Sequence, residues 1–198
     1  MRKLTNKPMK IQAKTKLQTI AMLLCFSLLP GLRATTLARL SLDQLAAAAD
    51  GVARVRCAAA ESRWENGAIW TVTTFDVIET LKGSLPGQVV VHLPGGRVGH
   101  LTAAVDGAPK FRPGEQAVVF LERAGTGGYS VAGWVEGTFR IVQDPISRRE
   151  IVTQDSSGFA VFDQATRTFR AEGIRKMPME QFRARVGAAI ARGREKSR

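Results

Sequence analysis

Residues 52–81, VARVRCAAAESRWENGAIWTVTTFDVIETL, decide the fold class of this protein. Two runs with the alternation and composition of strands, Val52–Arg63 and Ile69–Leu81, lie on either side of the segment Glu65-Asn66-Gly67. Asn-Gly between two such runs is typical of a tight hairpin turn. The stretch therefore predicts two long antiparallel strands.

Alternation within the first run assigns its side chains to two faces of the strand. The small apolar residues and the cysteine share the inward face: Ala53, Val55, Cys57 and Ala59. Arg54 and Arg56 take the other face. Cys57 is therefore expected to be a buried, unreactive core residue. In the second run the inward parity changes between Val72 and Phe75, which predicts a bulge or bend there.

Further short strands follow along the chain. They are predicted at Gln88–Leu93, Gln116–Leu121, Tyr129–Ala132 and Thr138–Val142. The continuously apolar Ala117–Leu121 predicts a central strand that is buried on both faces. Pro94–Pro113 is predicted to be a long glycine-bearing loop. Many short strands with one long bent strand favour a small OB-like β-barrel, placed at residues 35–143.

Two helices and a small β appendage complete the predicted architecture. Ser41 and Gln44 have capping-box spacing, which predicts a short helix before the first strand. Residues 144–176 are predicted to form a small hairpin layer. From Pro178 a helical stripe predicts an amphipathic helix that docks on the barrel: Met179, Phe182, Val186 and Ile190. Residues 144–198 are thus expected to hold the hairpin appendage and the C-terminal helix.

The first 34 residues differ from the rest and are predicted to be a signal peptide, residues 1–34. They contain seven Lys and Arg and no acid, followed by the apolar run Leu17–Leu29 and a small residue, Ala34, at the exit. The run is shorter than the roughly 20 apolar residues of a membrane-spanning helix; an uncleaved signal anchor is the alternative. The protein is expected to be exported to the periplasm or the extracellular space. Membrane contact is expected only through the signal peptide before cleavage.

Cleavage would change both the charge and the cysteine content. The formal net charge of +12 would fall to about +5, within the range of ordinary soluble proteins, so nucleic acid is not an expected partner. Of the two cysteines only Cys57 would remain, and one cysteine cannot form an internal disulfide.

Four segments together resemble a known family. They are LAAAAD (45–50), VARVR (52–56), FDVIETLKG (75–83) and FRPGEQAVVFL (111–121). This pattern resembles the netrin-like OB barrels, which include the tissue inhibitors of metalloproteinases. The pattern consists of a helix ending in Ala-Asp, a first strand, a long strand that ends in Leu-Lys-Gly, and Pro-Gly-Glu before a buried strand. The chain is most similar to a group of uncharacterised exported bacterial proteins with the same Gly-Gly loop and C-terminal helix.

The resemblance implies a fold and not an activity. It covers about residues 41–143, and the helix adds 178–192. The metalloproteinase inhibitors bind the target's zinc through an N-terminal cysteine, but the mature chain here would begin near Thr35, without one. That mechanism therefore does not transfer to this chain.

The sequence favours a binding module over an enzyme. It has two histidines, His92 and His100, and no His-Glu-x-x-His, Gly-x-Ser-x-Gly or Cys-x-x-Cys motif. The candidate binding residues are in the long loop: Gly95, Gly96, Arg97 and His100. The expected function is an exported, non-catalytic, protease-associated or protein-interaction module, with another exported protein as partner and no cofactor or metal. The alternative is an exported hydrolase or metal-dependent enzyme with a site that no motif marks.

Overall fold

The structure is a computed structural model that describes most of the chain after residue 39. The described residues are 40–125, 127–158, 161–163, 168–170 and 173–196, and they belong to one compact unit. The predicted signal peptide, residues 1–34, lies outside them and stays a prediction. Among the described residues, no helix combines the length and the apolar character needed to cross a membrane.

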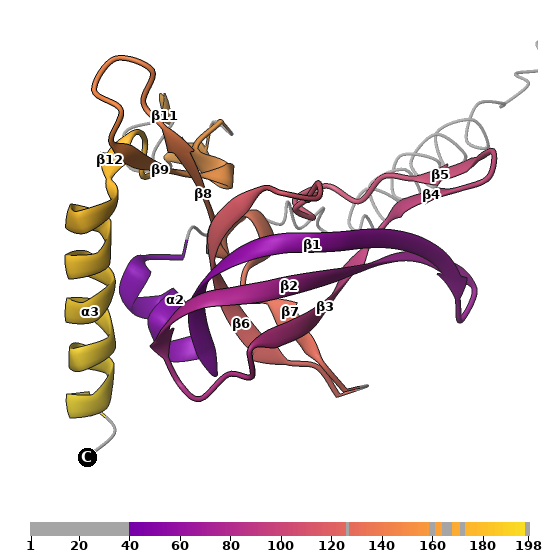
Figure 1. The fold of residues 1–198 in the computed structure, drawn as a ribbon, viewed down its shortest axis with the longest axis horizontal. Coiled ribbons are helices and arrows are strands. Elements are labelled where there is room, and N and C mark those ends of the chain that lie inside the picture. Colours follow the sequence, from indigo (N-terminus) through magenta and orange to yellow (C-terminus); the bar gives the residue numbers. More distant parts are fainter. Residues whose placement is uncertain (1–39, 126, 159–160, 164–167, 171–172, 197–198) are drawn as a thin grey trace, which may run out of the picture. The chain divides into compact units, whose positions relative to one another are not determined.

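The described chain is mainly β, with a C-terminal helix (Figure 1). The strands are β1 (Gly51–Glu65), β2 (Ala68–Lys82), β3 (Gln88–Pro94), β4 (Gly96–Val98), β5 (Leu101–Ala103), β6 (Gln116–Arg123), β7 (Tyr129–Val131), β8 (Thr138–Gln143), β9 (Glu150–Gln154), β10 (Val161–Asp163), β11 (Thr168–Arg170) and β12 (Met177–Pro178). The helices are α2 (Leu42–Ala48) and α3 (Met179–Lys196), with 3-10 turns η1 (Trp134–Gly137) and η2 (Asp155–Gly158).

Eight of the described strands form one sheet in the order β1-β2-β3-β7-β6-β8-β9-β12. β1 also pairs with β6, so the pairings that run through β2, β3, β7 and β6 return to β1. β3 and β7 are parallel at Val91 and Tyr129, and the other pairs are antiparallel. Two short hairpins, β4–β5 and β10–β11, are separate two-stranded sheets.

The turn between β1 and β2 is the one that the sequence predicts. Asn66 and Gly67 have φ values of 50° and 80°, the pair of positive angles that a type I′ hairpin turn requires. The capping box at α2 is also confirmed, because the Ser41 hydroxyl accepts from the Gln44 backbone N–H and the Gln44 side chain accepts from the Ser41 N–H.

The predicted bulge or bend between Val72 and Phe75 has a counterpart at that level, but the extra residue is in β1 and not in β2. Thr74 pairs with Ala59 and Phe75 pairs with Cys57, so Ala58 has no partner in β2. The predicted change of inward parity within β2 is wrong, because Thr73 takes the inward position and is fully buried. An unpaired residue in a strand reverses the facing of the residues after it.

Because of the irregularity at Ala58, the predicted assignment of side chains to the two faces of the first strand is wrong after Cys57. Cys57 is buried, as predicted, but Ala59 does not continue its face. Ala60 packs against the core in that place, and Ser62 follows it on the same side. The interior row of β1 therefore changes from odd to even residue numbers at the point where the strand bends.

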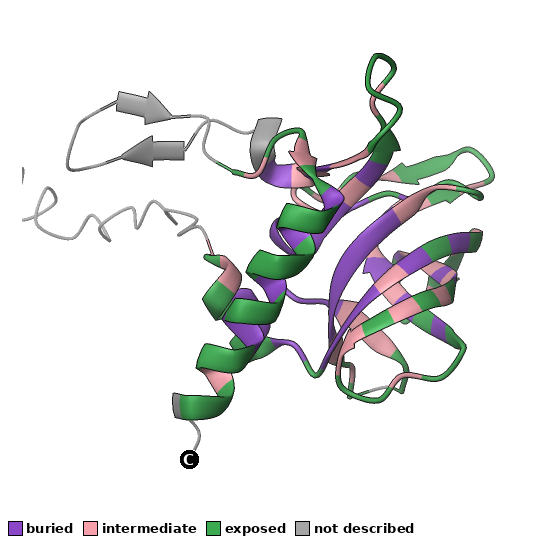
Figure 2. Ribbon diagram, turned by 60° about the vertical axis from the view of Figure 1, so that its left-hand side comes forward, coloured by how far each residue is buried: buried purple, intermediate pink, exposed green. Residues whose placement is uncertain are grey.

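Two hydrophobic clusters hold the described residues together (Figure 2). One lies inside the ring of strand pairings and includes Cys57, Phe75, Val91 and Leu121. Residues Ala117 to Leu121 are all 0% exposed and contribute to the two clusters in alternation, which confirms the predicted central strand, now β6.

The second cluster lies under α3. Phe182 is fully buried, and its ring centroid lies 4.8 Å from that of Phe139 in β8. Met179, Val186 and Ile190 of the predicted stripe are buried in the same cluster, together with Leu45 of α2. The prediction that this helix docks on the β structure through its apolar stripe is confirmed.

Two segments differ from the sequence-based expectation. Pro94–Pro113 is not a continuous loop, because β4 and β5 form a hairpin within it. The segment 144–176 is not a separate layer throughout, because β9 pairs with β8 and carries the large sheet on to β12. β4 and β5 have three residues each, fewer than the roughly four residues over which alternation marks a strand. The strand with which β9 pairs has no signature in a single sequence.

Candidate functional site

The four predicted binding residues all lie at the β4–β5 hairpin. Gly95 directly precedes β4 and donates its N–H to the Ile69 carbonyl at 2.8 Å. Gly96 and Arg97 are in β4, and His100 is in the turn that leads to β5. The structure therefore brings them to one hairpin. It does not bring their side chains around one cavity, because Arg97 and His100 are exposed.

The two glycines have a structural role that the sequence pattern did not reveal. Gly95 and Gly96 have φ values of 89° and 135°, which side-chain-bearing residues rarely adopt. A Cβ on Gly96 would overlap the hydroxyls of Ser62 and Thr71. The Thr71 hydroxyl donates to the Gly95 carbonyl at 2.7 Å, so these glycines let β4 cross closely over the inner side of the β1–β2 hairpin.

A small hollow of about 200 Å³ lies beneath this crossing. Its lining includes Ser62, Thr71, Gly95, Lys110 and Phe111. The hydroxyls of Ser62 and Thr71 lie 2.9 Å apart and are bonded to each other. The hollow is below the size range of about 300–1,000 Å³ that is usual for small-molecule sites.

The hairpin region also exposes large apolar side chains. Trp64, near the end of β1, is 58% exposed, and Leu101 in β5 is 48% exposed. Trp64 follows Ser62 by two residues in β1, and side chains two residues apart in a strand share a face. The Trp64 side chain is therefore on the face that β4 crosses. Figure 1 shows both hairpins extending beyond the same end of the large sheet.

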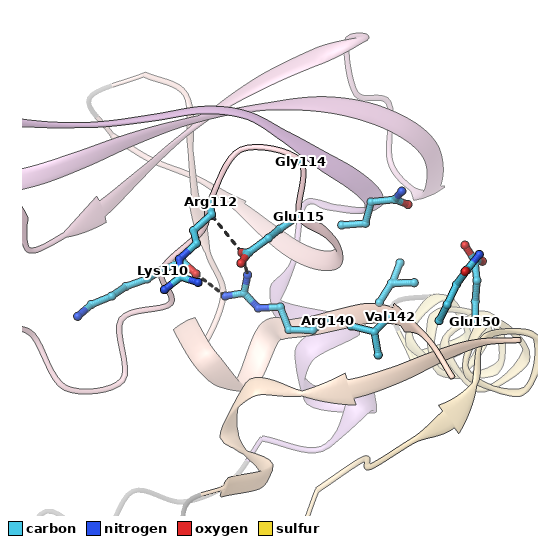
Figure 3. A pocket seen from close by; sticks show the side chains of 10 residues that line it. Lys110, Arg112, Gly114, Glu115, Arg140, Val142 and Glu150 are labelled. Atoms are coloured by element: carbon cyan, nitrogen blue, oxygen red, sulfur yellow. Dashed lines mark hydrogen bonds and ion pairs between the residues drawn. The ribbon is translucent and has the colours of Figure 1, made fainter. Parts of the chain in front are cut away.

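A larger hollow lies beside β8 and is called here the Arg140 hollow (Figure 3). It has a volume of about 720 Å³, and its lining includes Lys110, Arg112, Glu115, Arg140, Val142 and Glu150. The turn before β6 forms one wall, and the end of the β8–β9 hairpin forms the other.

Arg140 holds the wall of this hollow in place. Its guanidinium donates to both Asp155 oxygens, to Glu115 at 2.8 Å and to the Lys110 carbonyl at 2.6 Å. Its Cζ also lies 4.1 Å from the centre of the Phe111 ring, within the range of a cation–π contact. One side chain thus joins β8 to the turn before β6 and to η2.

A second arginine binds two residues that line the hollow. Arg54 in β1 donates to both Glu150 oxygens, at 2.9 and 2.6 Å, and to the Gln116 side-chain oxygen at 2.7 Å. The two carboxylates that line the hollow, Glu115 and Glu150, are therefore each bound to a guanidinium. Lys110 and Arg112 differ from them, because their side chains have no ionic or hydrogen-bonding partner among the residues that the structure describes.

Cys57 lies behind the turn that forms this wall. Its N–H donates to the Glu115 carbonyl and its carbonyl accepts from the Gly114 N–H, both at 2.8 Å. Burial raises the pKa of the Cys57 thiol, and the charge of Glu115 raises it further, against a smaller opposite effect of Arg140. A buried thiol with a raised pKa is a weak nucleophile, which agrees with the core role predicted for Cys57.

Sequence reasoning missed the Arg140 network entirely. Arg140 is separated by 15 residues from Asp155 and by 25 from Glu115, and it occupies an ordinary outward position between two buried residues of β8. No motif spacing marks such a cluster, because tertiary folding alone brings its members together.

In the part of the chain that the structure describes, no group of three or more His, Cys, Asp or Glu side chains is arranged to hold a metal ion. Comparisons with protein-family models, with curated proteins and with solved structures each gave no match to this chain.

Proposed function

We propose that this protein is an exported, non-catalytic binding module that recognises another exported protein through its two projecting hairpins. The proposed scaffold is an OB-like barrel of the netrin-like type. The return of the strand pairings to β1 supports this assignment, because the OB fold is a five-stranded barrel and β1, β2, β3, β7 and β6 are the five strands of the ring.

The observation that carries the proposal is the hairpin arm, defined as residues 58–74 of β1 and β2. The pairing of β1 with β6 ends at Arg56, and within the described residues β1 pairs only with β2 from Ala59 onward, while β2 pairs with β3 as far as Trp70. The end of the arm, residues 64–69, thus extends past the pairings of the ring and exposes Trp64, although large aromatic side chains normally stabilise a fold by burial. Tryptophan is among the residues that contribute most to protein–protein binding.

The β4–β5 hairpin would form the second half of the same surface. It packs on the arm through Gly96, and the part of it beyond that contact exposes Leu101, Arg97 and His100. The two hairpins together expose a tryptophan, a leucine and basic side chains, which are residue types found in the apolar centre and the polar rim of binding surfaces.

The test compares two sets of exposed apolar residues. The biotin-tagged full chain is incubated with exported proteins of the source organism, as wild type, as the double variant Trp64→Ala and Leu101→Ser, and as the control Ile146→Ser. Ile146 is 92% exposed in the turn after β8, away from the hairpins. Proteins retained by the wild type and by the control, but not by the double variant, support the proposal.

The opposite pattern would overturn it. If the double variant has an unchanged melting temperature and still retains every protein that the wild type retains, the hairpins are not the binding surface. If the control loses the same proteins as the double variant, the retention reflects nonspecific apolar contact.

A further inference from the structure

The Arg140 hollow combines features that point to a ligand of defined chemistry. Its volume of about 720 Å³ is within the usual range of about 300–1,000 Å³ for ligand sites. Its two carboxylates, Glu115 and Glu150, are each neutralised by an arginine, whereas Lys110 and Arg112 are exposed cations without a partner among the described residues. The charge that remains available to a ligand is therefore positive.

These charges are not spread evenly over the hollow. Figure 3 shows Lys110 and Arg112 at the end next to Arg140, and Glu150 at the opposite end, with Val142 between them. The Val142 side chain is 52% exposed although its residue is in a strand of the large sheet. A ligand that fills the hollow would place acidic groups at the first end and uncharged groups over Val142.

The backbone along the hollow has an open strand edge. β8 pairs with β6 from Thr138 to Ile141, but Val142 and Gln143 pair only with β9 among the described residues. Because successive residues of a strand direct their N–H and C=O groups to opposite neighbours, one of these two residues directs both groups into the hollow. Such an edge is a site at which an extended segment can pair.

From these three features we propose that the Arg140 hollow binds an extended, acidic peptide segment of another protein. Carboxylates of the segment contact Lys110 and Arg112, its backbone pairs with the open edge of β8, and an apolar side chain covers Val142. Arg140 acts as a positioning residue, because its own hydrogen bonds are already used within the wall. The proposal goes beyond the hairpin binding surface and does not depend on it.

The test uses a six-residue peptide of alternating glutamate and valine with blocked ends, and a matched peptide in which lysine replaces each glutamate. Binding to the purified full chain is followed by amide NMR at low ionic strength, because contacts between exposed charges are screened by salt. The wild type is expected to bind the acidic peptide, with the largest shifts at the amides of Val142 and Gln143, and not the basic one.

Variants separate this site from general charge attraction. The double variant Lys110→Glu and Arg112→Glu is expected to bind the acidic peptide about tenfold more weakly, since it replaces two attractions by two repulsions. The matched control Arg123→Glu and Arg185→Glu removes two exposed cations elsewhere and is expected to bind as the wild type does.

Three results would overturn the proposal: no binding of the acidic peptide by the wild type, equal weakening in both double variants, or shifts away from Val142 and Gln143. All three leave the hairpin surface untouched, so failure here is distinguishable from failure of the proposed function. The amide spectrum of each free variant shows directly whether it has kept the fold.

Discussion

Truncation of Phe182 tests the docking of α3 most directly. Its side chain is fully buried and stacks obliquely on Phe139, with 4.8 Å between ring centroids and 44° between ring planes. Phe182→Ala would remove that ring contact and leave a cavity between α3 and β8, and such changes cost about 3–5 kcal/mol in well-packed cores. Domains of this size are commonly stable by about 5–15 kcal/mol, so the loss would be a large part of the total.

Urea denaturation of the purified protein measures this effect. With an m value of about 1–3 kcal/mol/M, a loss of about 4 kcal/mol lowers the midpoint by roughly 1–4 M. Arg185→Ala is the matched control, because Arg185 is on the exposed side of the same helix and surface substitutions usually change the stability by less than about 0.5 kcal/mol.

A change of less than about 1 kcal/mol for Phe182→Ala would refute the reasoning, because it would mean that α3 contributes little to the folded state. Binding to anionic vesicles is a second readout. If the variant Phe182→Asp lost vesicle binding without losing stability, α3 would be a membrane-surface helix and not part of the core.

Three further outcomes follow from the same contacts. Replacement of Arg140 by Met is expected to lower the free energy of unfolding, measured by urea denaturation, by about 2–3 kcal/mol, because it leaves Asp155 and Glu115 without their partner. This loss is smaller than that for a fully buried ion pair, because the Glu115 side chain is 38% exposed. In a Cys25→Ser background, maleimide should label Cys57 in denaturant but not in native buffer, and rapid native labelling would contradict its inward position. Mass spectrometry of the exported protein should find an N-terminus near Thr35, whereas an intact leader in the membrane fraction would contradict the predicted cleavage.

The raised pKa of Cys57 also gives the stability a pH dependence. The thiol stays protonated in the folded chain at a pH where it ionises in the unfolded chain, so its contribution is complete below the unfolded pKa and is lost as the pH rises through the folded one. The free energy of unfolding should therefore fall more steeply above about pH 9 in the wild type than in Cys57→Ala, and equal slopes would contradict the shift.

Local features of the fold could be predicted because local physics determines them. The capping box at Ser41, the Asn66-Gly67 turn and the burial of Phe182 each depend on residues close in sequence. The sequence pattern places the irregularity in β2 and not in β1, because a polar residue such as Thr73 is not expected at an inward position. Burial of its hydroxyl, which has no hydrogen-bond partner among the described residues, is a cost that composition alone does not predict.

Of the two candidate sites, one could be found in part from the sequence and the other could not. The glycines near β4 could be found as a sequence feature, but their role in the close crossing over Ser62 depends on which strand passes beneath them. The Arg140 hollow could not be found, since its members come from the turn before β6, from β8 and from β9. Arginine is suited to such a place, because its planar group donates in several directions at once and can join three elements with one side chain.

The hairpin surface and the Arg140 hollow both depend on one segment, which the network around Arg140 holds in place. The segment from Lys110 to Glu115 lines the small hollow under the β4–β5 crossing on one side and the Arg140 hollow on the other. Its position depends on Arg140, which binds the Lys110 carbonyl and the Glu115 carboxylate and stacks on Phe111 between them. Loss of Arg140 should therefore alter the amide spectrum of β4 and β5 as well as that of the β8 edge. Loss of Arg54 should affect its partners Glu150 and Gln116 and leave β4 and β5 unchanged. If the Arg140→Met variant changed the β8 edge alone, the two surfaces would be independent.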